Sequence, residues 1–139
     1  MTFNIYPATQ KEVKFIDNKI DEFNKSQVPF TQEQAVIPKN YVIKDNGKII
    51  AGINADIYYW RILYIGVLFV DEDRRGKQLG SALLRKVENE AKTMGATLAH
   101  LDTFDYQAKD FYLRHGYEVF GVLEDCPVGH RRYYLKKKL

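Results

Sequence analysis

The fold is decided by residues 70–81, VDEDRRGKQLGS, because this polar loop joins two stretches of different periodicity. Residues 62–70 before it are almost continuously apolar, which predicts a strand buried on both faces. Residues 79–94 carry apolar side chains at helical spacing, and Gly95 follows where helices often end in a left-handed residue. With the strand-like residues 97–101, this order predicts two parallel strands joined by a right-handed crossover.

The other segments predict a mixed α/β sheet with helices beside it. Residues 2–6 resemble a short strand, residues 13–23 are helical in period, and residues 32–37 form a second helical piece. Residues 41–50 predict a hairpin whose second strand continues to residue 58, because its Asn-Gly turn at 46–47 suits positive φ angles. A helix over 108–115 and strands over 117–123 and 131–135 complete the order.

Composition places residues 1–139 in a single globular domain, with 45% hydrophobic and 28% charged side chains. The net charge of +3 is too small for a protein that binds nucleic acid mainly by neutralising phosphates. Cys126 has no cysteine to pair with, and the three histidines lack metal-ligand spacing, so we expect no metal. Because no apolar run reaches membrane-spanning length and no signal sequence is visible, we expect a cytoplasmic protein without a membrane partner.

The polar loop has the composition of an anion site. It carries three cations, Arg74, Arg75 and Lys77, and two glycines, Gly76 and Gly80, immediately before a helix. Glycine lets backbone N–H groups approach an anion, and the helix N-terminus adds unpaired donors and partial positive charge. The spacing matches neither GxxxxGK[ST] nor GxGxxG, so the loop predicts a pyrophosphate ligand of another class.

Two segments resemble motifs of the GNAT superfamily of N-acetyltransferases. Residues 75–80, RGKQLG, are similar to the acetyl-CoA motif [QR]-x-x-G-x-[GA], with Gln78 in place of the middle glycine. Residues 105–117, DYQAKDFYLRHGY, are similar to N-x-x-A-x-x-F-Y-x-x-x-G-[FY], with Asp105 in place of asparagine. The resemblance implies the GNAT fold, a mostly antiparallel sheet with one splayed parallel pair and helices on both faces. It also implies transfer of an acetyl group from acetyl-CoA to a primary amine by direct attack in a ternary complex.

The resemblance also implies roles for individual residues. The backbone of Leu68, Phe69 and Val70 would pair with the pantetheine arm, and an N–H there would stabilise the thioester oxyanion. Tyr112 would give a proton to the departing thiolate. Asp105 would either contact the cofactor or cap the following helix. The pyrophosphate would be bound by Arg75, Gly76, Lys77, Gln78, Leu79, Gly80 and Ser81.

The proton acceptor and the amine are left open by the sequence. The apolar strand contains no Asp, Glu or His that could accept the proton of the attacking amine. Three routes for this proton remain open: Asp56, Glu33, or a water chain with Tyr58 or Tyr64. We favour the water chain. We expect Asp56, Tyr58 and Trp60 to contact the acceptor, which is either a small molecule or a protein amine. Whether the chain forms a homodimer is also open.

Two other interpretations compete with this one. A CoA-binding sensor would keep the anion loop without turnover, and the missing carboxylate in the strand and Asp105 motivate it. A nucleic-acid-binding domain would use the basic loop and the tail at residues 136–138, which we expect to be only solvated. Cys126 lacks an activating neighbour, so direct transfer is preferred to an acyl-enzyme.

Overall fold

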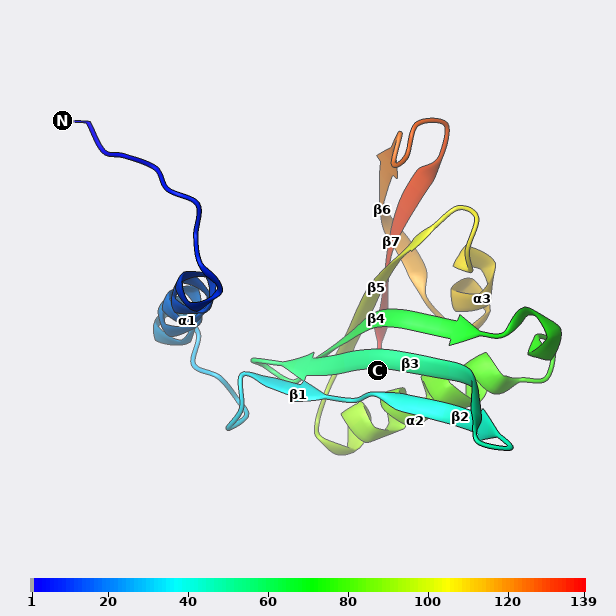
Figure 1. Ribbon diagram of the computed structural model, residues 1–139. Helices are drawn as coiled ribbons and strands as arrows, with labels where there is room; N and C mark the ends of the chain where they lie inside the picture. The colour runs from blue at the N-terminus through cyan, green and yellow to red at the C-terminus, as the bar shows by residue number, and fades with distance from the viewer. Residues whose placement is uncertain (1) are drawn as a thin grey trace.

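A computed structural model describes residues 2–139 and shows one mixed seven-stranded sheet in the order β1-β3-β4-β5-β7-β6, with β2 also paired to β3 (Figure 1). The expected mixed sheet with one parallel pair is therefore confirmed. The elements are α1 (Gln10–Gln27), β1 (Val36–Pro38), β2 (Tyr41–Asp45), β3 (Lys48–Tyr58), β4 (Ile62–Val70), the 3-10 helix η1 (Glu72–Arg74), α2 (Leu79–Thr93), β5 (Leu98–Phe104), α3 (Lys109–Arg114), β6 (Glu118–Glu124) and β7 (Arg131–Lys138).

The core lies between α2 and one face of the sheet, with α2 running below the sheet in Figure 1. Alternate residues of β3 point toward α2, as the period of two in a strand requires. Each fully buried aliphatic side chain stabilises the fold by about 1.5–3 kcal/mol. The largest fully buried side chains are Ile53, Ile57, Leu63, Ile65, Leu84, Leu101, Leu135 and Val87.

The parallel pair β4–β5 is short. Its register runs only from Leu63 opposite Ala99 to Ile65 opposite Leu101. Beyond Ile65, β4 stays paired with β3 as far as Val70, whereas β5 stays paired with β7. The two strands therefore diverge, and residues 66–70 keep a backbone edge without a strand partner.

The structure corrects one burial prediction, that of a strand over 62–70 buried on both faces. Only Leu63 and Ile65 are buried in β4, while Val67 and Phe69 are about half exposed. The prediction was wrong because α2 covers only one face of β4. Leu68 and Val70 pack against the core on that face, whereas Val67 and Phe69 alternate with them and lie on the other face.

Two predicted elements near the N-terminus are also wrong. Residues 2–6 form no strand, and residues 32–37 form bends followed by β1 instead of a helix. The side-chain amide of Gln32 fixes this segment, because it donates to the Ile57 carbonyl at 2.9 Å and accepts from the Arg61 N–H at 3.1 Å. These long-range bonds replace the local hydrogen bonds that a helix would make.

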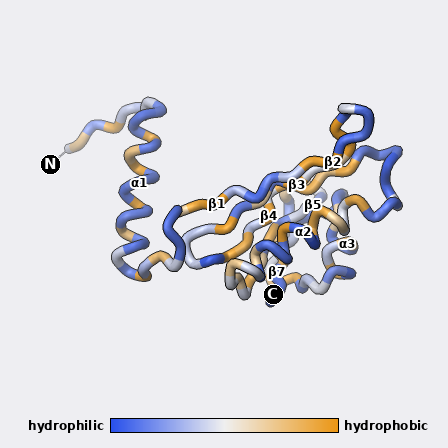
Figure 2. The backbone as a smooth tube through the Cα atoms, turned by 90° about the horizontal axis from the view of Figure 1, so that it is seen from below, coloured by the Kyte–Doolittle hydropathy of each residue, from blue (hydrophilic) through white to orange (hydrophobic). Residues whose placement is uncertain are grey.

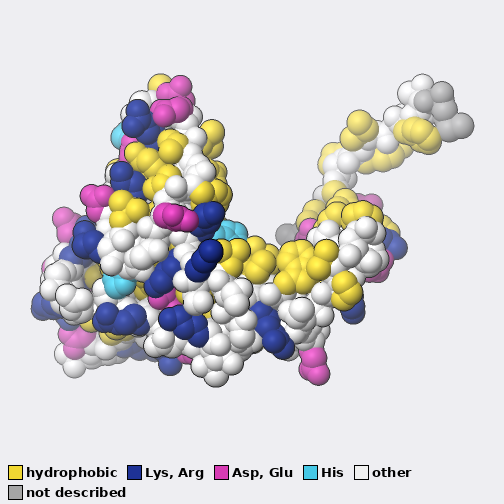
Figure 3. Space-filling model, turned by 180° about the vertical axis from the view of Figure 1, so that it is seen from behind, with side chains coloured by type: hydrophobic (Ala, Val, Ile, Leu, Met, Phe, Trp, Pro, Cys, Tyr) yellow, Lys and Arg dark blue, Asp and Glu magenta, His cyan; other side chains and the backbone are white. Residues whose placement is uncertain are grey.

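The helix predicted over 13–23 exists as α1, but it stands away from the sheet (Figure 1). A capping box between Thr9 and Glu12 starts it. None of its residues is buried, and hydrophobic and hydrophilic residues alternate along its turns (Figure 2). Figure 3 shows a hollow between α1 and the rest of the molecule, with hydrophobic side chains along it. No helix within residues 2–139 has the length and apolar character needed to cross a membrane.

Positive φ angles mark two turns that the sequence patterns indicated. Asn46 (φ 50°) and Gly47 (φ 79°) form the predicted hairpin turn. In the loop before α2, Gly76 has φ 79° and Gln78, the N-cap of α2, has φ 65°. Gln78 replaces the motif's middle glycine, so a residue with a side chain occupies a left-handed position that favours glycine.

A cluster around Glu90 joins α2 to the neighbouring strand edge. Its Oε1 accepts from the Tyr41 hydroxyl at 2.6 Å and from Lys39 Nζ at 3.0 Å, and its Oε2 lies 3.2 Å from Lys86 Nζ. The Tyr41 and Lys39 hydrogen bonds lower the pKa of Glu90 to about 2. The carboxylate therefore contributes stability above the pKa of the unfolded chain, and this stability is lost as the pH falls toward the folded-state value.

Replacing Gln78 with glycine should stabilise the protein by about 1 kcal/mol, because glycine removes the left-handed strain at a small entropic cost in the unfolded chain. Urea unfolding monitored by circular dichroism measures the change. Gly76→Ala is the matched control, because its added Cβ meets no atom within 4 Å and only the φ angle is strained. That variant should be destabilised, and a less stable Gln78→Gly would contradict the strain at this turn.

Glu90→Gln should reduce the free energy of unfolding at pH 7 by about 1 kcal/mol, since the partly exposed cluster is screened by water. The difference from wild type should vanish as the pH falls from about 4.5 toward 2, where the wild-type carboxylate becomes protonated. Glu118→Gln is the control, because Glu118 is exposed and only approaches Lys136 at 3.9 Å. A difference that persists unchanged at the lowest pH would show that packing, not charge, stabilises the cluster.

Candidate active site

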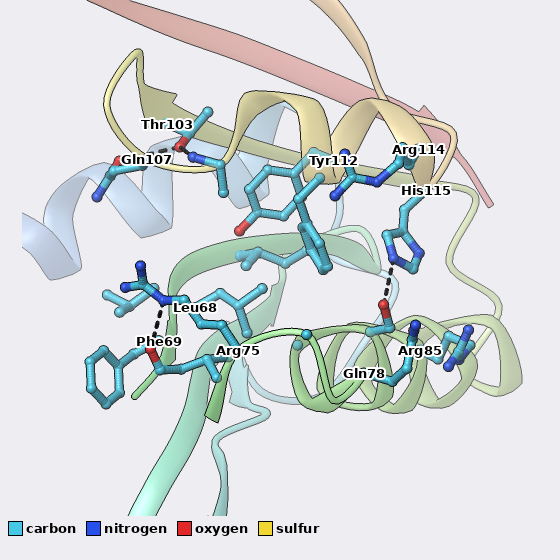
Figure 4. Close-up of a pocket in the computed structure, with 18 of the residues that line it drawn as sticks. Leu68, Phe69, Arg75, Gln78, Arg85, Thr103, Gln107, Tyr112, Arg114 and His115 are labelled. Atoms are coloured by element: carbon cyan, nitrogen blue, oxygen red, sulfur yellow. Dashed lines mark hydrogen bonds between the residues drawn. The ribbon is translucent and has the colours of Figure 1, made fainter. Parts of the chain in front are cut away.

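A cavity of about 740 Å³ fills the opening between β4 and β5 and is closed by the N-terminal end of α2 and by α3 (Figure 4). Its position follows from the divergence of the two strands, because residues 66–70 form one wall. Among the residues predicted to bind cofactor, the following line it: Leu68, Phe69, Val70, Arg75, Gly76, Gln78, Gly80 and Ser81.

The wall formed by β4 offers backbone donors and acceptors to a ligand. Residues 66–70 pair with β3 on one side only, so their other edge can bind an extended chain as a further strand would. The Arg75 Nε donates weakly to the carbonyl of Val70 at 3.4 Å, which draws the guanidinium back along this wall. The edge matches the placement that the sequence motifs implied for the pantetheine arm.

The α2 end of the cavity is positively charged. The first N–H groups of α2 have no partner within the helix, and the N-terminus carries partial positive charge. Arg75, Arg85 and Arg114 line the cavity. Arg74 lines it too, but its guanidinium is paired with Asp45 at 2.7 Å, so its charge is already compensated.

Arg85 and Arg114 were missed by the sequence reasoning. Arg85 lies one helical turn after Ser81, on the side of α2 that borders the cavity. Arg114 lies near the end of α3, within the second motif but at one of its variable positions. Helical spacing from Ser81 would have pointed to Arg85, whereas Arg114 depends on where α3 packs.

Close packing between α2 and α3 shapes the floor. A Cβ added to Gly80 would lie 3.4 Å from Phe111 Cζ and 3.6 Å from Val70 Cγ2, which are ordinary van der Waals distances, so α2 and α3 lie in contact here. Ser81 Oγ is hydrogen-bonded to His115 Nε2 at 2.9 Å, as the dashed line in Figure 4 shows. These contacts join the two helices across the cavity's inner end.

Tyr112 of α3 lies in the cavity wall with its ring toward the open space (Figure 4). Only 5% of its surface is exposed, and its hydroxyl makes no hydrogen bond within residues 2–139. Burial, with a smaller effect from the charge of Asp102, raises the pKa of Tyr112 to about 12. The phenol therefore remains protonated near neutral pH and is available as a donor.

Three residues predicted to bind cofactor lie elsewhere. Lys77 and Leu79 are not among the cavity-lining residues, and Leu79 instead packs against the core. Asp105 accepts from His130 Nδ1 and from the Arg131 N–H, both at 2.9 Å. The prediction that Asp105 caps α3 is wrong, because the N-cap is Ala108 and its side chain makes no cap bond.

The sheet face opposite α2 carries polar and aromatic side chains, and we call Asp56, Tyr58, Tyr64 and His100 the open face. Asp56, Tyr64 and His100 are register partners on three adjacent strands. The Tyr58 hydroxyl is hydrogen-bonded to His100 Nε2 at 2.7 Å. Burial raises the pKa of Asp56, and the nearby His100 lowers it by a smaller amount. Burial also lowers the pKa of His100.

Asp102 connects the open face to the cavity. It lines the cavity and accepts a hydrogen bond from the Tyr64 hydroxyl at 3.1 Å. Arg132 donates to the same carboxylate through Nε at 2.9 Å and Nη2 at 2.6 Å, which holds it in place. Neither Asp102 nor His100 was identified from the sequence, because their proximity to Tyr64 depends on strand register.

Trp60 and Glu33, which the sequence also singled out, lie outside both the cavity and the open face. Trp60 is in the β3–β4 turn, where Nε1 donates to the Val28 carbonyl at 3.0 Å and the ring contacts Phe30 edge-on. Its indole therefore fixes the C-terminal end of α1. Glu33 is exposed in the bends before β1.

Comparison with known proteins supports the family indicated by this geometry. Residues 7–117 match the model of the Acetyltransferase (GNAT) family. Blasticidin-S acetyltransferase of Streptomyces morookaense is 32% identical over 100 residues, which cover 71% of this chain and 73% of that protein. The crystal structure of an acetyltransferase from Bacillus cereus ATCC 14579 superposes with a TM-score of 0.88 at 37% identity, over 99% of this chain and 98% of that one.

A more distant structure has the same fold. Aminoglycoside 6′-N-acetyltransferase complexed with coenzyme A superposes with a TM-score of 0.63 at 19% identity, over 88% of this chain and 80% of that one. The family match covers most of the chain, and both nearer relatives are named acetyltransferases. The chain therefore belongs to the GNAT family of acetyltransferases.

Proposed function

We propose that this protein transfers an acetyl group from acetyl-CoA to a primary amine of a small cationic molecule by direct attack. The observation that carries the proposal is the Tyr112 hydroxyl, which has no hydrogen-bond partner within residues 2–139 and opens onto a cavity walled by the unpaired edge of β4. A proton donor and an array of backbone donors thus face the same space. Acyl transfer from a thioester needs both.

The residues present fit acetyl-CoA as the donor substrate. The extended pantetheine arm, with its amide groups, matches the exposed edge of residues 66–70. The pyrophosphate matches the α2 N-terminus, because its first backbone N–H groups have no partner within the helix, and Arg75 adds positive charge to the same cavity. Arg85 and Arg114 supply further positive charge for the phosphate groups. The coenzyme A complex of the aminoglycoside acetyltransferase supports this assignment through the shared fold.

The transfer needs no acyl-enzyme. The neutral amine nitrogen attacks the thioester carbon, a C–N bond forms, and the carbonyl oxygen becomes an oxyanion that an N–H of β4 stabilises. The C–S bond then breaks, and Tyr112 Oη–H donates its proton to the leaving sulfur. The amine releases its extra proton to water, and Tyr112 regains a proton from solvent after the product leaves.

The proton from the amine leaves, in this proposal, through water on the open face. Burial lowers the pKa of His100, so its ring is neutral near pH 7 and can accept a proton. Tyr64 and Asp102 continue the polar path from His100 to the cavity, with the Tyr64 and His100 ring centroids 5.1 Å apart. This path keeps the water chain favoured from the sequence and adds the histidine to it.

We assign the class of the acceptor amine from the charge of Asp56 on the open face. Asp56 is partly buried and has no hydrogen-bonded cation within residues 2–139, so a second positive group on the acceptor would compensate its charge. We take this acceptor to be a small molecule. Blasticidin-S acetyltransferase, a relative named for a small-molecule acceptor, supports this class.

Tyr112→Phe should lower kcat by about 100-fold, since general acid catalysis typically contributes 10²–10⁴-fold. Affinity for acetyl-CoA should change little, because phenylalanine keeps the packing of the ring. Steady-state release of CoA, with spermidine among a panel of amines, gives kcat, and calorimetry gives the dissociation constant.

Tyr6→Phe is the control, because it removes a phenol hydroxyl that is exposed and lies outside the cavity. Equal losses in both variants would contradict the acid role. Tight acetyl-CoA binding by wild type without turnover of any amine would favour the CoA-binding sensor, and absence of binding would overturn the proposal.

Asp56→Asn should raise the KM of a diamine acceptor about 10-fold, the effect of losing about 1.4 kcal/mol of charge-assisted hydrogen bonding. The KM of a monoamine should change much less, because it brings no second cation to this carboxylate. Both constants come from the CoA-release assay. Glu118→Gln, on the exposed side of β6, is the control, and equal changes for both acceptors would contradict the assignment.

A further inference from the structure

The carboxylate of Asp102 is held in place but is not saturated with hydrogen bonds. Its Oδ1 accepts from Nε and Nη2 of Arg132, at 2.9 and 2.6 Å. Within residues 2–139, its Oδ2 accepts only from the Tyr64 hydroxyl, at 3.1 Å. An ionised carboxylate offers about four acceptor sites. One site of Oδ2 is therefore left for a ligand, on a side chain that lines the cavity and is 17% exposed.

Asp102 lies where the cavity meets the open face. In β5, Leu101 and Thr103 are buried against the core, so Asp102 between them lies on the other face of the sheet, together with His100. Asp102 also lines the cavity, because the pairing of β5 with β4 ends at Leu101. Its charge contributes to the raised pKa of Tyr112, the proposed proton donor to the thiolate. A nitrogen bound to Asp102 would therefore reach the thioester from the open face.

The carboxylates of Asp102 and Asp56 differ in how their charges are compensated. Asp102 is paired with Arg132. The guanidinium of Arg132 is in turn held over two rings, 5.3 Å from the centroid of Phe104 and 5.5 Å from that of Tyr134. Asp56 forms no salt bridge within residues 2–139.

This difference suits two nitrogens with different tasks. An uncompensated carboxylate favours the charged form of a nearby amine and so keeps its proton bound. A carboxylate paired with a guanidinium has this effect to a much smaller degree. The attacking nitrogen must lose its proton, so Asp102 can accept its N–H without holding it as an ammonium. Asp56 instead suits a cation that takes no part in the reaction.

The strand register sets the distance between the two carboxylates. Asp56, Tyr64 and His100 lie in one row across β3, β4 and β5, and Asp102 lies two residues further along β5. Two strand spacings of about 4.8 Å and two residues of about 3.3 Å put the Cα atoms of Asp56 and Asp102 roughly 12 Å apart. Both side chains leave the same face of the sheet, so the nitrogens that they bind would be about 10–12 Å apart.

We propose that Asp102 Oδ2 accepts a hydrogen bond from the attacking nitrogen, and that Asp102 and Asp56 together select linear amines with a second cationic nitrogen about 10–12 Å from the first. This inference rests on the proposed function, because it names the acceptors that the same site takes. Arg132 is a positioning residue, since it fixes the carboxylate of Asp102 and limits its attraction for the amine proton. An extended chain advances about 1.2 Å per bond, so the nine bonds between the nitrogens of 1,8-diaminooctane span this distance.

Calorimetry on the full chain saturated with CoA tests the spacing without depending on turnover. 1,8-Diaminooctane should bind about 10-fold more tightly than 1,4-diaminobutane, which is too short, and than octylamine, which has the same carbon chain but one nitrogen. 1,12-Diaminododecane should gain no affinity over 1,8-diaminooctane, although it is more apolar. Asp56→Asn should abolish the preference over octylamine. Affinity that rises steadily with chain length, or equal affinity for octylamine, would overturn the selection by two carboxylates.

The pH profile of kcat for 1,8-diaminooctane tests the roles of Asp102 and Arg132. Arg132→Gln removes the compensating charge, so the bound ammonium keeps its proton to higher pH, and the rising limb of kcat should move up by about one pH unit. Asp102→Asn removes the negative charge, so the limb should move down by about one pH unit, and the plateau of kcat should fall by about 10-fold.

The titrating group in this profile is the bound amine. Its titratable and charged surroundings come from every element around Asp102: Asp56 on β3, Tyr64 on β4, His100 on β5, Tyr112 on α3, Arg132, Tyr134 and Lys136 on β7, and Cys126 between β6 and β7. Only the two substitutions at the Asp102–Arg132 pair change the charge of these groups in opposite directions, so opposite shifts identify this pair.

Glu124→Gln and Arg131→Gln are the matched controls, because they break an exposed carboxylate–arginine pair of the β6–β7 hairpin, with Oε2 and Nε 3.0 Å apart. Their profiles should match wild type. Circular dichroism and calorimetry with CoA verify that each variant is folded and binds CoA. Limbs that do not move, or that move in the same direction in Asp102→Asn and Arg132→Gln, would contradict the role of Asp102. Diamine binding with the expected length preference but without acetylation of any amine would support the spacing and overturn the proposed transfer.

Discussion

The early end of the parallel pairing between β4 and β5 is the constraint on which the rest of the site depends. Only three residue pairs join the strands, and the last is Ile65 with Leu101. Each strand keeps its antiparallel partner beyond that point, so the sheet opens without losing stability on its outer sides. The opening creates the cavity and at the same time leaves the backbone of residues 66–70 unpaired. A backbone edge able to bind an extended ligand therefore arises from hydrogen-bond geometry, and the side chains of β4 are free to serve packing.

Two helices keep this opening at a fixed width. Gly80 of α2 lies against Phe111 of α3, and the Ser81–His115 hydrogen bond joins the same helices. Tyr112 is buried by the same packing, which both orients its hydroxyl and raises its pKa. The Tyr112 hydroxyl has no hydrogen-bond partner within residues 2–139, but it opens onto the cavity and is therefore not cut off from solvent. The same contacts account for the shape of the cavity and for the protonation state of its donor.

Local chemistry was predictable from the sequence, and long-range register was not. The Asn46–Gly47 turn, the helix after residue 78 and the position of Tyr112 follow from patterns contained within a few residues. The open face depends on which residues of β3, β4 and β5 stand opposite one another, and no local pattern encodes this. The helix over 32–37 was wrongly predicted for the same reason. The amide of Gln32 forms hydrogen bonds with residues more than 20 positions away, which no local pattern encodes. Charge placement was predictable only in part, since Arg74 is neutralised by a hairpin residue distant in sequence.

The aromatic turn between β3 and β4 contacts two different parts of the molecule. Tyr58 and Trp60 were predicted from the sequence to contact the acceptor, and that remains a prediction. In the structure Tyr58 faces His100, whereas Tyr59 and Trp60 bind the end of α1. The turn therefore separates two surfaces, one polar and facing the site, the other apolar and holding the helix.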